Sequence, residues 1–109
     1  MAGLLGKQKM LRIYISENDT IDGRPLYKAI VELCSEQGIA GATVLRGIYG
    51  YGSRGEIHSS RTLTLSSSLP LVVEIIDTEE NIDAILPLID PMMSGGMITI
   101  EMINVLKYE

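Results

Sequence analysis

The most informative stretch of this sequence is Gly47-Ile48-Tyr49-Gly50-Tyr51-Gly52-Ser53-Arg54-Gly55, in which glycines crowd the end of a run rich in β-formers. Because glycine has no Cβ, nothing at these glycines keeps a ligand away from the main-chain N–H donors. Hydroxyl-bearing and basic residues come next, with Arg54, His58 and Arg61 close by in the sequence. This combination predicts a turn that binds an anion, and phosphate is the obvious candidate.

The spacing Gly50-x-Gly52-x-x-Gly55 formally matches the dinucleotide-binding fingerprint, but that fingerprint requires a helix to begin at the turn. The segment 56–68 instead alternates apolar residues with Ser and Thr, which indicates a long loop or an extended ribbon. A Rossmann fold is therefore rejected. A plainer alternative stays open, in which the glycines serve only a hairpin with bulges.

Strand patterns flank the glycine-rich stretch on both sides. Alternating or β-branched apolar residues predict strands at 10–16, 42–51, 70–77 and 97–106. Only the region at about 51–69 is long and irregular, and loops of that length inside a domain are usually functional or mobile.

Two helices are predicted between these strands. Asp22 and Pro25 are start signals for the first helix, and Gly38 is its stop signal. Asp77 and Glu80 form a plausible capping box for the second helix, which we expect Pro87 to kink or to end.

The resulting order is β-α-β, a long loop, then β-α-β. Two such units interleave as one antiparallel four-stranded sheet with both helices on one face, which is the ferredoxin-like plait of the α+β class. With 109 residues the chain has room for one domain, so residues 1–109 are expected to form a single domain.

The sheet face without helices is expected to be buried against other copies of the chain. Each strand contributes one charge among its apolar residues, and these charges are Arg12, Arg46, Glu74 and Glu101. Hydrophobic residues make up 46% of the chain, which is more than a small domain can bury alone. We therefore expect a homo-oligomer with ion pairs on this face.

Charge and cysteine content exclude several classes of protein. The formal net charge of −5 argues against nucleic acid as a partner. The sequence shows no signal peptide and no apolar run long enough for a membrane span, so we expect no direct membrane insertion. Cys34 is the only cysteine and reads as a core residue, which suits a reducing compartment and predicts a cytoplasmic protein.

Metal binding and catalysis have weak support in the sequence. His58 is the only histidine, which excludes a site with several imidazole ligands within one chain. His58 and Glu56 could serve a small phosphohydrolase, but carboxylates that would hold magnesium are not clustered. We expect a protein that is not an enzyme.

A second glycine pair, Gly95-Gly96, precedes the last strand, as the first glycine group follows a strand. A helix C-cap and turn would explain the pair without any ligand. In the plait, however, both glycine-rich turns can approach the edge of the sheet where subunits would meet. Two bare turns with nearby cations make a better phosphate cleft than one.

These features resemble a known family. Gly50-Tyr51-Gly52 after a strand, then Leu69-Pro70 and Val73-Glu74-Ile75-Ile76, resemble the PII nitrogen-regulatory signal proteins. The segment Arg46-Gly47-Ile48-x-Gly50-Tyr51-Gly52, together with Ile57-His58, is even more similar to the PII-like family of uncharacterised bacterial and archaeal proteins. The similarity covers residues 10–108.

The resemblance implies a homotrimer that binds ATP or ADP between subunits and grips partner proteins with the loop after the second strand. It implies nucleotide contacts from Gly50, Gly52, Ser53 and Arg54 at the base of the loop, from the turn Ser94, Gly95 and Gly96, and from Lys107 of the C-terminal segment. His58 and Arg61 would belong to the partner or effector loop. PII proteins have a basic residue after the second turn where this chain has Met97, so ADP or another adenylate fits as well as ATP.

The predicted function is therefore that of a nucleotide-responsive signalling protein, with ADP or ATP as ligand, with or without Mg²⁺, and no obligatory cofactor. Two alternatives stay open. One is a ferredoxin-like trimer that binds a metal or a partner protein without nucleotide, and the other is the small phosphohydrolase.

Overall fold

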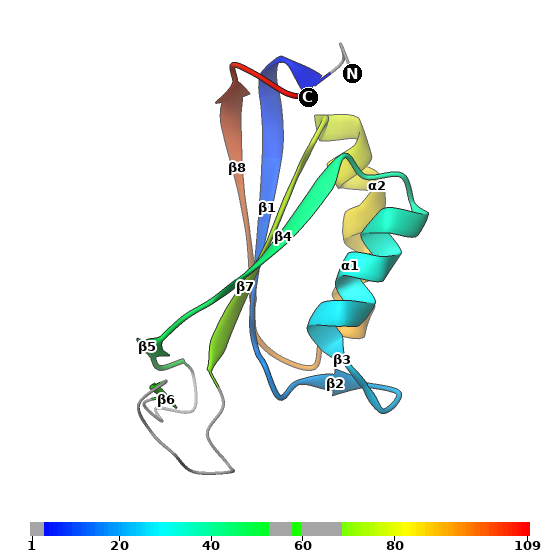
Figure 1. The fold of residues 1–109 in the computed structure, drawn as a ribbon. Helices are drawn as coiled ribbons and strands as arrows, with labels where there is room; N and C mark the ends of the chain where they lie inside the picture. Colours follow the sequence, from blue (N-terminus) through cyan, green and yellow to red (C-terminus); the bar gives the residue numbers. More distant parts are fainter. Residues whose placement is uncertain (1–3, 53–57, 60–68) are drawn as a thin grey trace.

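In the computed structural model, which describes residues 4–52, 58–59 and 69–109, four strands form one sheet and two helices pack on one of its faces (Figure 1). The strands are β1 (Gly6–Ser16), β4 (Gly41–Arg46), β7 (Pro70–Asp77) and β8 (Met97–Val105), in the spatial order β4-β7-β1-β8. The helices are α1 (Leu26–Glu36) and α2 (Glu79–Ile89). All three strand pairings are antiparallel, which confirms the predicted ferredoxin-like α+β plait.

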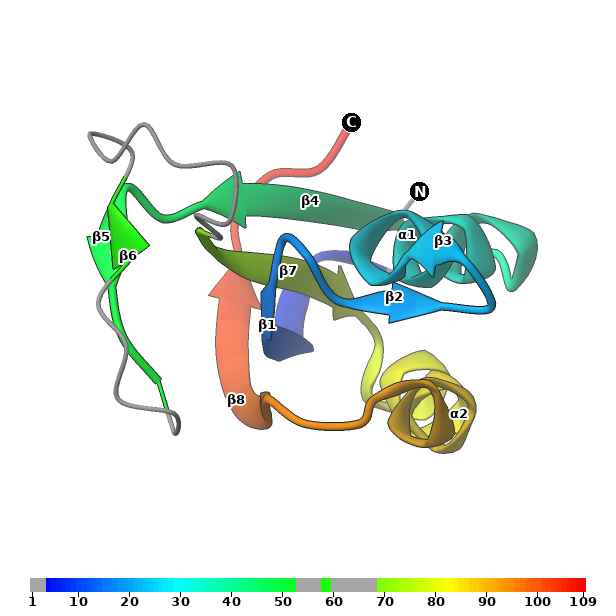
Figure 2. The ribbon, with the colours of Figure 1, turned by 90° about the horizontal axis from the view of Figure 1, so that it is seen from below.

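Shorter elements decorate this plait. A small hairpin, β2 (Thr20–Ile21) and β3 (Arg24–Pro25), leads into α1, and the 3-10 helix η2 (Asp90–Met92) follows α2. A second two-stranded piece, β5 (Tyr49–Gly50) and β6 (His58–Ser59), lies beyond the end of β4, away from the helices (Figure 2). Most of the predicted loop at 51–69 lies outside the described residues.

The core lies between the helices and one face of the sheet. Alternate residues of β1 and β7, such as Leu11, Ile13 and Val73, are fully buried, because the pleat points every second side chain toward the helices. Helix residues such as Ile30 and Ile82 pack against these side chains and are equally buried. The period-two pattern of the sequence therefore fixes which face of the sheet the helices cover.

The first helix follows its predicted signals at Pro25 and Gly38, but the prediction for Asp22 is wrong, because Asp22 lies in the turn between β2 and β3 and does not cap the helix. Pro25 is the residue before its first turn, and Gly38, with φ +75°, lies just beyond its end. Cys34 is buried in the core as expected, and burial raises the pKa of its thiol to about 11. A thiol with that pKa stays protonated near neutral pH and is a poor nucleophile.

The start of the second helix differs from the predicted capping box of Asp77 and Glu80. Thr78 is the N-cap, and its hydroxyl accepts a hydrogen bond from the main-chain N–H of Asn81 at 3.1 Å. The buried Asp77 carboxylate instead accepts from the main-chain N–H of Thr78 and of Ala40, and from the Asn81 side chain. The helix continues past Pro87 to Ile89, so Pro87 does not end it.

The second predicted strand is shorter than expected. β4 ends at Arg46, and a break at Gly47 precedes β5. The main-chain N–H of Gly47 donates to the Pro70 carbonyl at 2.7 Å, and a Cβ at Gly47 would lie only 2.7 Å from Pro70 Cγ. Gly47 is therefore required by this close approach to Pro70.

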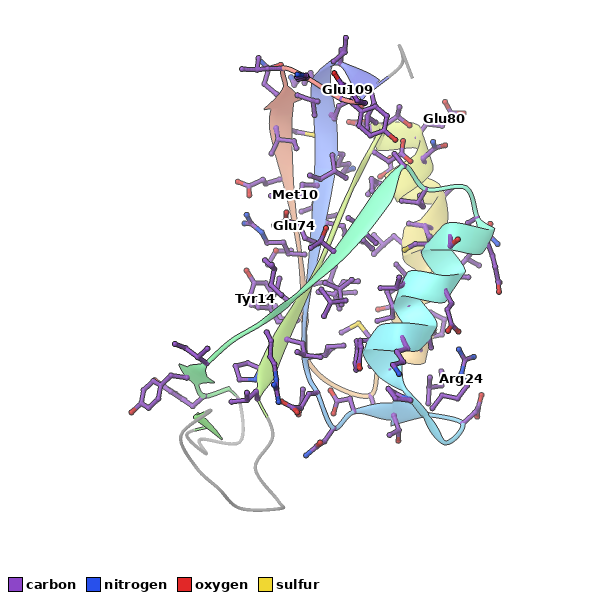
Figure 3. The ribbon with its side chains drawn as sticks, in the orientation of Figure 1. Met10, Tyr14, Arg24, Glu74, Glu80 and Glu109 are labelled. Atoms are coloured by element: carbon purple, nitrogen blue, oxygen red, sulfur yellow. The ribbon has the colours of Figure 1, made fainter. Side chains whose placement is uncertain are left out.

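The uncovered face of the sheet holds three of the four predicted charges. Arg12 pairs with Glu74 at 3.1 Å and with Glu101 at 3.0 Å, so one guanidinium bridges three strands. Met10, Tyr14 and Glu74 lie on this side, opposite the helices (Figure 3).

The prediction for Arg46 is wrong. Arg46 continues the alternation of Ala42 and Val44, which pack against the core on the helix side of the sheet. Its guanidinium pairs with Glu17 at 2.9 Å instead of joining the Arg12 cluster.

No helix among the described residues is both long and apolar enough to cross a bilayer.

Gly96 gives a direct test of the fold at the start of β8. Its φ is +92°, and an added Cβ would overlap the main-chain oxygen of Tyr14. We expect Gly96→Ala to lower the free energy of unfolding by about 2–4 kcal/mol, since backbone strain adds to the clash. Gly95→Ala is the matched control, because nothing lies within 4 Å of an added Cβ there, and it should change stability by less than about 0.5 kcal/mol. Urea unfolding measures both, and equal losses would contradict this account.

Candidate functional site

The two glycine-rich turns lie at the same end of the sheet but at its opposite edges. The first turn follows β4 and the second precedes β8, and these two strands are the edges of the order β4-β7-β1-β8. Three inter-strand spacings separate the edges, or about 14 Å. One chain therefore does not bring the two turns together.

Glycines of the first turn have two different structural roles. An added Cβ at Gly47 would lie only 2.7 Å from Pro70 Cγ, so packing requires Gly47, whereas at Gly50 it would make an ordinary contact of 3.5 Å with the same atom. Gly52 faces open space, with nothing within 4 Å of an added Cβ. Among the described glycines of this turn, packing within the chain explains Gly47 but neither Gly50 nor Gly52, and Gly52 is the more open of these two.

Four other residues predicted for the nucleotide or the loop cannot be placed in full. Ser53, Arg54 and Arg61 lie outside the described residues. His58 belongs to β6, where its backbone pairs with Gly50. Because β5 and β6 pair antiparallel, His58 and Ser59 lie beside Gly50 and Tyr49 of the first turn.

The second turn repeats this division of roles. Gly96 is held against β1 by its contact with Tyr14, with Met93 Cε 3.1 Å from an added Cβ. Gly95 faces open space, and Ser94 is exposed next to it. The turn thus presents one bare glycine and one hydroxyl to solvent.

Lys107 lies at the opposite end of the sheet from both turns. It follows β8, whose nine residues span about 27 Å. Its side chain is 80% exposed and pairs with Glu109 at 3.5 Å. The neighbouring Tyr108 hydroxyl donates to the Ala40 carbonyl at 3.3 Å, which ties the tail to the segment before β4. Within one chain, Lys107 is therefore remote from the glycines.

Glu17 is a residue of this region that sequence reasoning did not single out. Its carboxylate accepts hydrogen bonds from the Arg46 guanidinium at 2.9–3.1 Å and from the main-chain N–H of Leu69 at 2.9 Å. The main-chain N–H of Glu17 donates to the Leu69 carbonyl at 3.0 Å. One side chain thus joins the end of β4 to the residue before β7, and we call this set of contacts the loop-base clamp.

Charge in the loop-base clamp shifts the pKa of both partners. The hydrogen bond from Arg46, followed by that from the Leu69 N–H, lowers the pKa of Glu17 below its ordinary value despite partial desolvation. The same ion pair raises the pKa of Arg46. The clamp is therefore fully charged near neutral pH and fixes both ends of the segment 47–68.

The described part of the chain contains no group of three His, Cys, Asp or Glu side chains that could hold a metal ion. What it offers at the sheet end is bare main chain at Gly52 and Gly95, with the Ser94 hydroxyl beside Gly95. Such an arrangement suits anion binding by N–H groups.

Comparison with protein families gives a match over most of the chain. The family DUF190, described as "Uncharacterized ACR, COG1993", matches residues 8–105. A UPF0166 protein of Aquifex aeolicus (strain VF5) is 46% identical over 100 residues, which cover 92% of this chain and 94% of that protein. The UPF0166 protein MJ1524 of Methanocaldococcus jannaschii is 41% identical over 104 residues, covering 94% of this chain and 95% of that protein.

Solved structures with the same fold include PII-like proteins. CPII from Thiomonas intermedia K12, a nitrogen regulatory PII-like protein solved with ADP, AMP and bicarbonate, is similar with a TM-score of 0.65 and 18% identity, covering 91% of this chain and 94% of CPII. A putative PII-like signaling protein from Thermus thermophilus gives a TM-score of 0.67 and 22% identity, covering 93% of this chain and 91% of that protein. The predicted resemblance to PII-like proteins is confirmed.

The loop-base clamp predicts a dependence of stability on pH. Because the pKa of Glu17 is lowered in the folded state, its stabilisation is present above about pH 4.5 and is lost as the pH falls through the folded pKa. At pH 7, Glu17→Gln should lower the free energy of unfolding by about 1 kcal/mol, since Arg46 is largely exposed and the pair is screened.

Chemical denaturation between about pH 7 and pH 3 measures this difference. Wild type and Glu17→Gln should converge at the acid end, whereas the exposed Glu36→Gln should follow wild type throughout. A constant difference at every pH would show that the Glu17 charge has no role.

Proposed function

The chain belongs to the DUF190 family of uncharacterised proteins, and on that premise we propose that it is a nucleotide-responsive regulator that binds ADP or ATP between subunits and acts by binding partner proteins. One observation carries the proposal. The chain shares the fold of CPII, a protein solved with ADP, AMP and bicarbonate, over nearly its whole length.

Placement of the glycine turns supports a site between subunits. Because the bare glycines Gly52 and Gly95 lie at opposite edges of one sheet, they can meet only where the β4 edge of one subunit adjoins the β8 edge of another. A closed ring of subunits repeats that contact without free edges, and the homotrimer implied by the resemblance is such a ring.

The proposed nucleotide site combines residues from two subunits. The first turn contributes Gly50, Gly52, Ser53 and Arg54, and the second contributes Ser94, Gly95 and Gly96. Main-chain N–H groups at the bare glycines would approach the phosphate oxygens. Lys107 lies at the other end of its own sheet, so it can contribute only from a neighbouring subunit.

Exposed apolar residues supply the surface for assembly. Leu45 is 50% exposed on the uncovered sheet face, opposite Val72 in the strand pairing, and Met97 is 52% exposed next to Tyr14 on the same face. The Arg12 ion pairs with Glu74 and Glu101 cancel part of the charge among them. Such a face favours burial against another copy.

Adenylates are the proposed ligand class, and ADP fits as well as ATP because Met97 follows the second turn. Any Mg²⁺ at the site would be held chiefly by the phosphates, since the described residues offer no group of three potential metal ligands. A protein of similar structure is named a putative PII-like signaling protein, which supports a binding function rather than a catalytic one. His58 and Arg61, in the loop after Gly52, would contact the regulated partner.

Calorimetric titration of ADP and ATP tests the site. A valine at Gly52 or Gly95 places methyl groups where phosphate oxygens must approach, and both positions have open space around an added Cβ. We therefore expect Gly52→Val and Gly95→Val to fold and to lose most of their affinity. Arg54→Ala should cost about 1–2 kcal/mol of binding, with a larger loss at low salt.

Gly41→Val is the matched control, because Gly41 also has open space but lies at the far end of β4. Its affinity should equal that of wild type. Wild-type affinity in both turn variants would make the turns purely structural. If no adenine nucleotide binds and copper or zinc stabilises the protein instead, the nucleotide proposal is wrong.

Light scattering tests the assembly. We expect a trimer mass for wild type at micromolar concentration. Leu45→Asp should shift the mass toward the monomer, because it would bury an unpaired charge in the interface. Leu88→Asp, on the helix side and 43% exposed, should remain a trimer. A monomeric wild type, or equal behaviour of the two variants, would overturn the proposed interface.

A further inference from the structure

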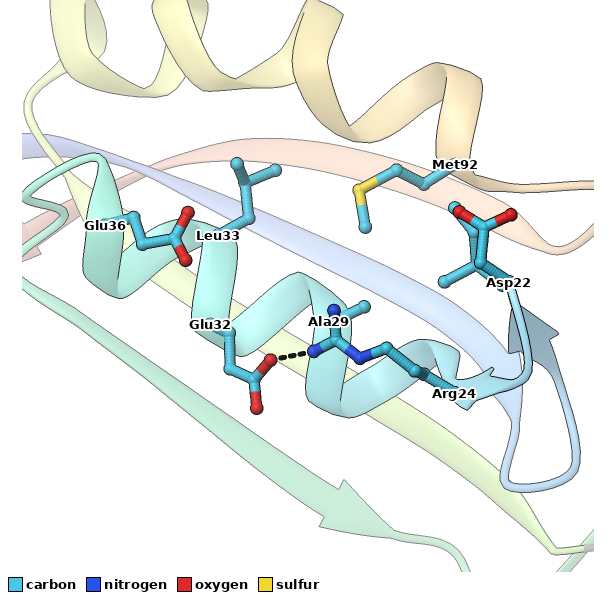
Figure 4. Close-up of a pocket in the computed structure, with 8 residues that line it drawn as sticks. Asp22, Arg24, Ala29, Glu32, Leu33, Glu36 and Met92 are labelled. Carbon is cyan, nitrogen blue, oxygen red and sulfur yellow. Dashed lines mark hydrogen bonds and ion pairs between the residues drawn. The ribbon is translucent and has the colours of Figure 1, made fainter.

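A groove on the helix side of the molecule is separate from both glycine turns. It lies between α1, the β2–β3 hairpin and η2, and has a volume of about 250 Å³ (Figure 4). Ala29 and Leu33 of α1 and Met92 of η2 form its apolar floor. Asp22, Arg24, Glu32 and Glu36 are its charged rim. We call this the acidic groove.

The sequence of α1 builds one wall of the acidic groove. Ala29, Leu33 and Glu36 recur at helical spacing, so they share a face of the helix. Leu26, Ile30 and Cys34 occupy the face turned into the core. Ala29 is itself buried and Leu33 packs against the edge of the core, so the groove wall runs along the border between the core and the exposed side of α1.

The opposite wall is set by a tight turn. Asp22 and Gly23 connect β2 to β3 with φ values of +51° and +78°, as a two-residue hairpin loop requires. This turn places Asp22 near the first residues of α1, while Glu36 is the last residue of that helix. In Figure 4 the two carboxylates lie at opposite ends of the groove, with Leu33 and Met92 between them.

Charges on the rim are unbalanced. Arg24 pairs with Glu32, which cancels one of the three carboxylates. Within residues 4–52, 58–59 and 69–109, neither Asp22 nor Glu36 is in an ion pair. The groove therefore offers two uncompensated negative charges on either side of an apolar floor.

The charge and the size of the acidic groove indicate which kind of ligand could bind there. The rim carboxylates do not form a metal-binding group within the described residues, which argues for an organic cation. The volume is below the roughly 300–1,000 Å³ of pockets for drug-sized ligands, so it suits a single long side chain. A second copy is a poorer match than a basic partner, because Asp and Glu outnumber Lys and Arg by 14 to 9 in this chain.

We propose that the acidic groove receives a basic segment of a partner protein. The aliphatic stem of a lysine or arginine lies on Leu33 and Met92, and its cationic head and a basic neighbour pair with Asp22 and Glu36. Long cationic side chains bury their stems on apolar surfaces in this way, and a methionine adapts its shape to such a stem. This inference goes beyond the nucleotide proposal and does not depend on it.

The probe is the peptide acetyl-Gly-Lys-Leu-Lys-Gly-amide, titrated without nucleotide into protein labelled at its methionine methyl groups. Met92→Leu identifies the Met92 signal. We expect a saturable shift of that signal with a dissociation constant on the order of 1 mM. The charge-reversed peptide acetyl-Gly-Glu-Leu-Glu-Gly-amide should give no shift at the same concentration.

Three carboxylate variants complete the test. Asp22→Asn keeps a side chain that tolerates positive φ. Asp22→Asn and Glu36→Gln, each made separately, should weaken peptide binding about five- to tenfold. Glu80→Gln removes an exposed carboxylate of α2 and should leave binding unchanged.

Equal binding of both peptides, equal losses in Glu80→Gln, or no Met92 shift would overturn the proposal. If spermidine binds more tightly than the peptide, as measured by the same Met92 signal, the occupant of the groove is a free polyamine and not a protein segment. If the Met92 signal shifts when only the protein concentration is raised, the occupant of the groove is a second copy of this chain. ADP titration of the same samples reports on the nucleotide site separately.

Discussion

Burial of only one face of the sheet is the constraint on which the rest of this structure depends. β1 is paired on both sides, with β7 and with β8, and its alternate residues Leu11, Ile13 and Ile15 face the helices. A shift of one residue in either pairing would turn these side chains to the uncovered face. The register is therefore strongly fixed, and it also decides that Arg12 meets Glu74 and Glu101 on the other side.

The same register places the glycine turns. β4 and β8 are both edges of the sheet, and the ends that carry Gly52 and Gly95 point the same way. The two bare glycines are thus oriented alike but separated by two strands. A site that uses both belongs to an assembly, whereas the loop-base clamp and the acidic groove are complete within one chain.

Local sequence patterns predicted the fold well, because the alternation of apolar residues along a strand directly determines which side chains face the core. The strand Pro70–Asp77 has the predicted bounds, since its β-branched residues alternate between core and uncovered face. Arg46 was misplaced because counting one charge per strand ignores the pairing, which aligns Arg46 with the buried Leu71. Thr78 was missed as the cap because the neighbouring Asp77 is an equally good capping residue, and only burial against Ala40 separates the two.

Long-range contacts of single side chains were beyond sequence reasoning. Glu17 meets Arg46 and Leu69, which lie 29 and 52 positions away, and no periodicity links the three. Sequence reasoning also could not tell which glycines are required by close packing. Gly96 and Gly47 are required, whereas Gly95 and Gly52 are not. A glycine motif in the sequence is therefore a mixture of structural and unexplained positions. Only the unexplained ones are evidence for a ligand, and among the described residues of the two turns these are Gly50, Gly52 and Gly95.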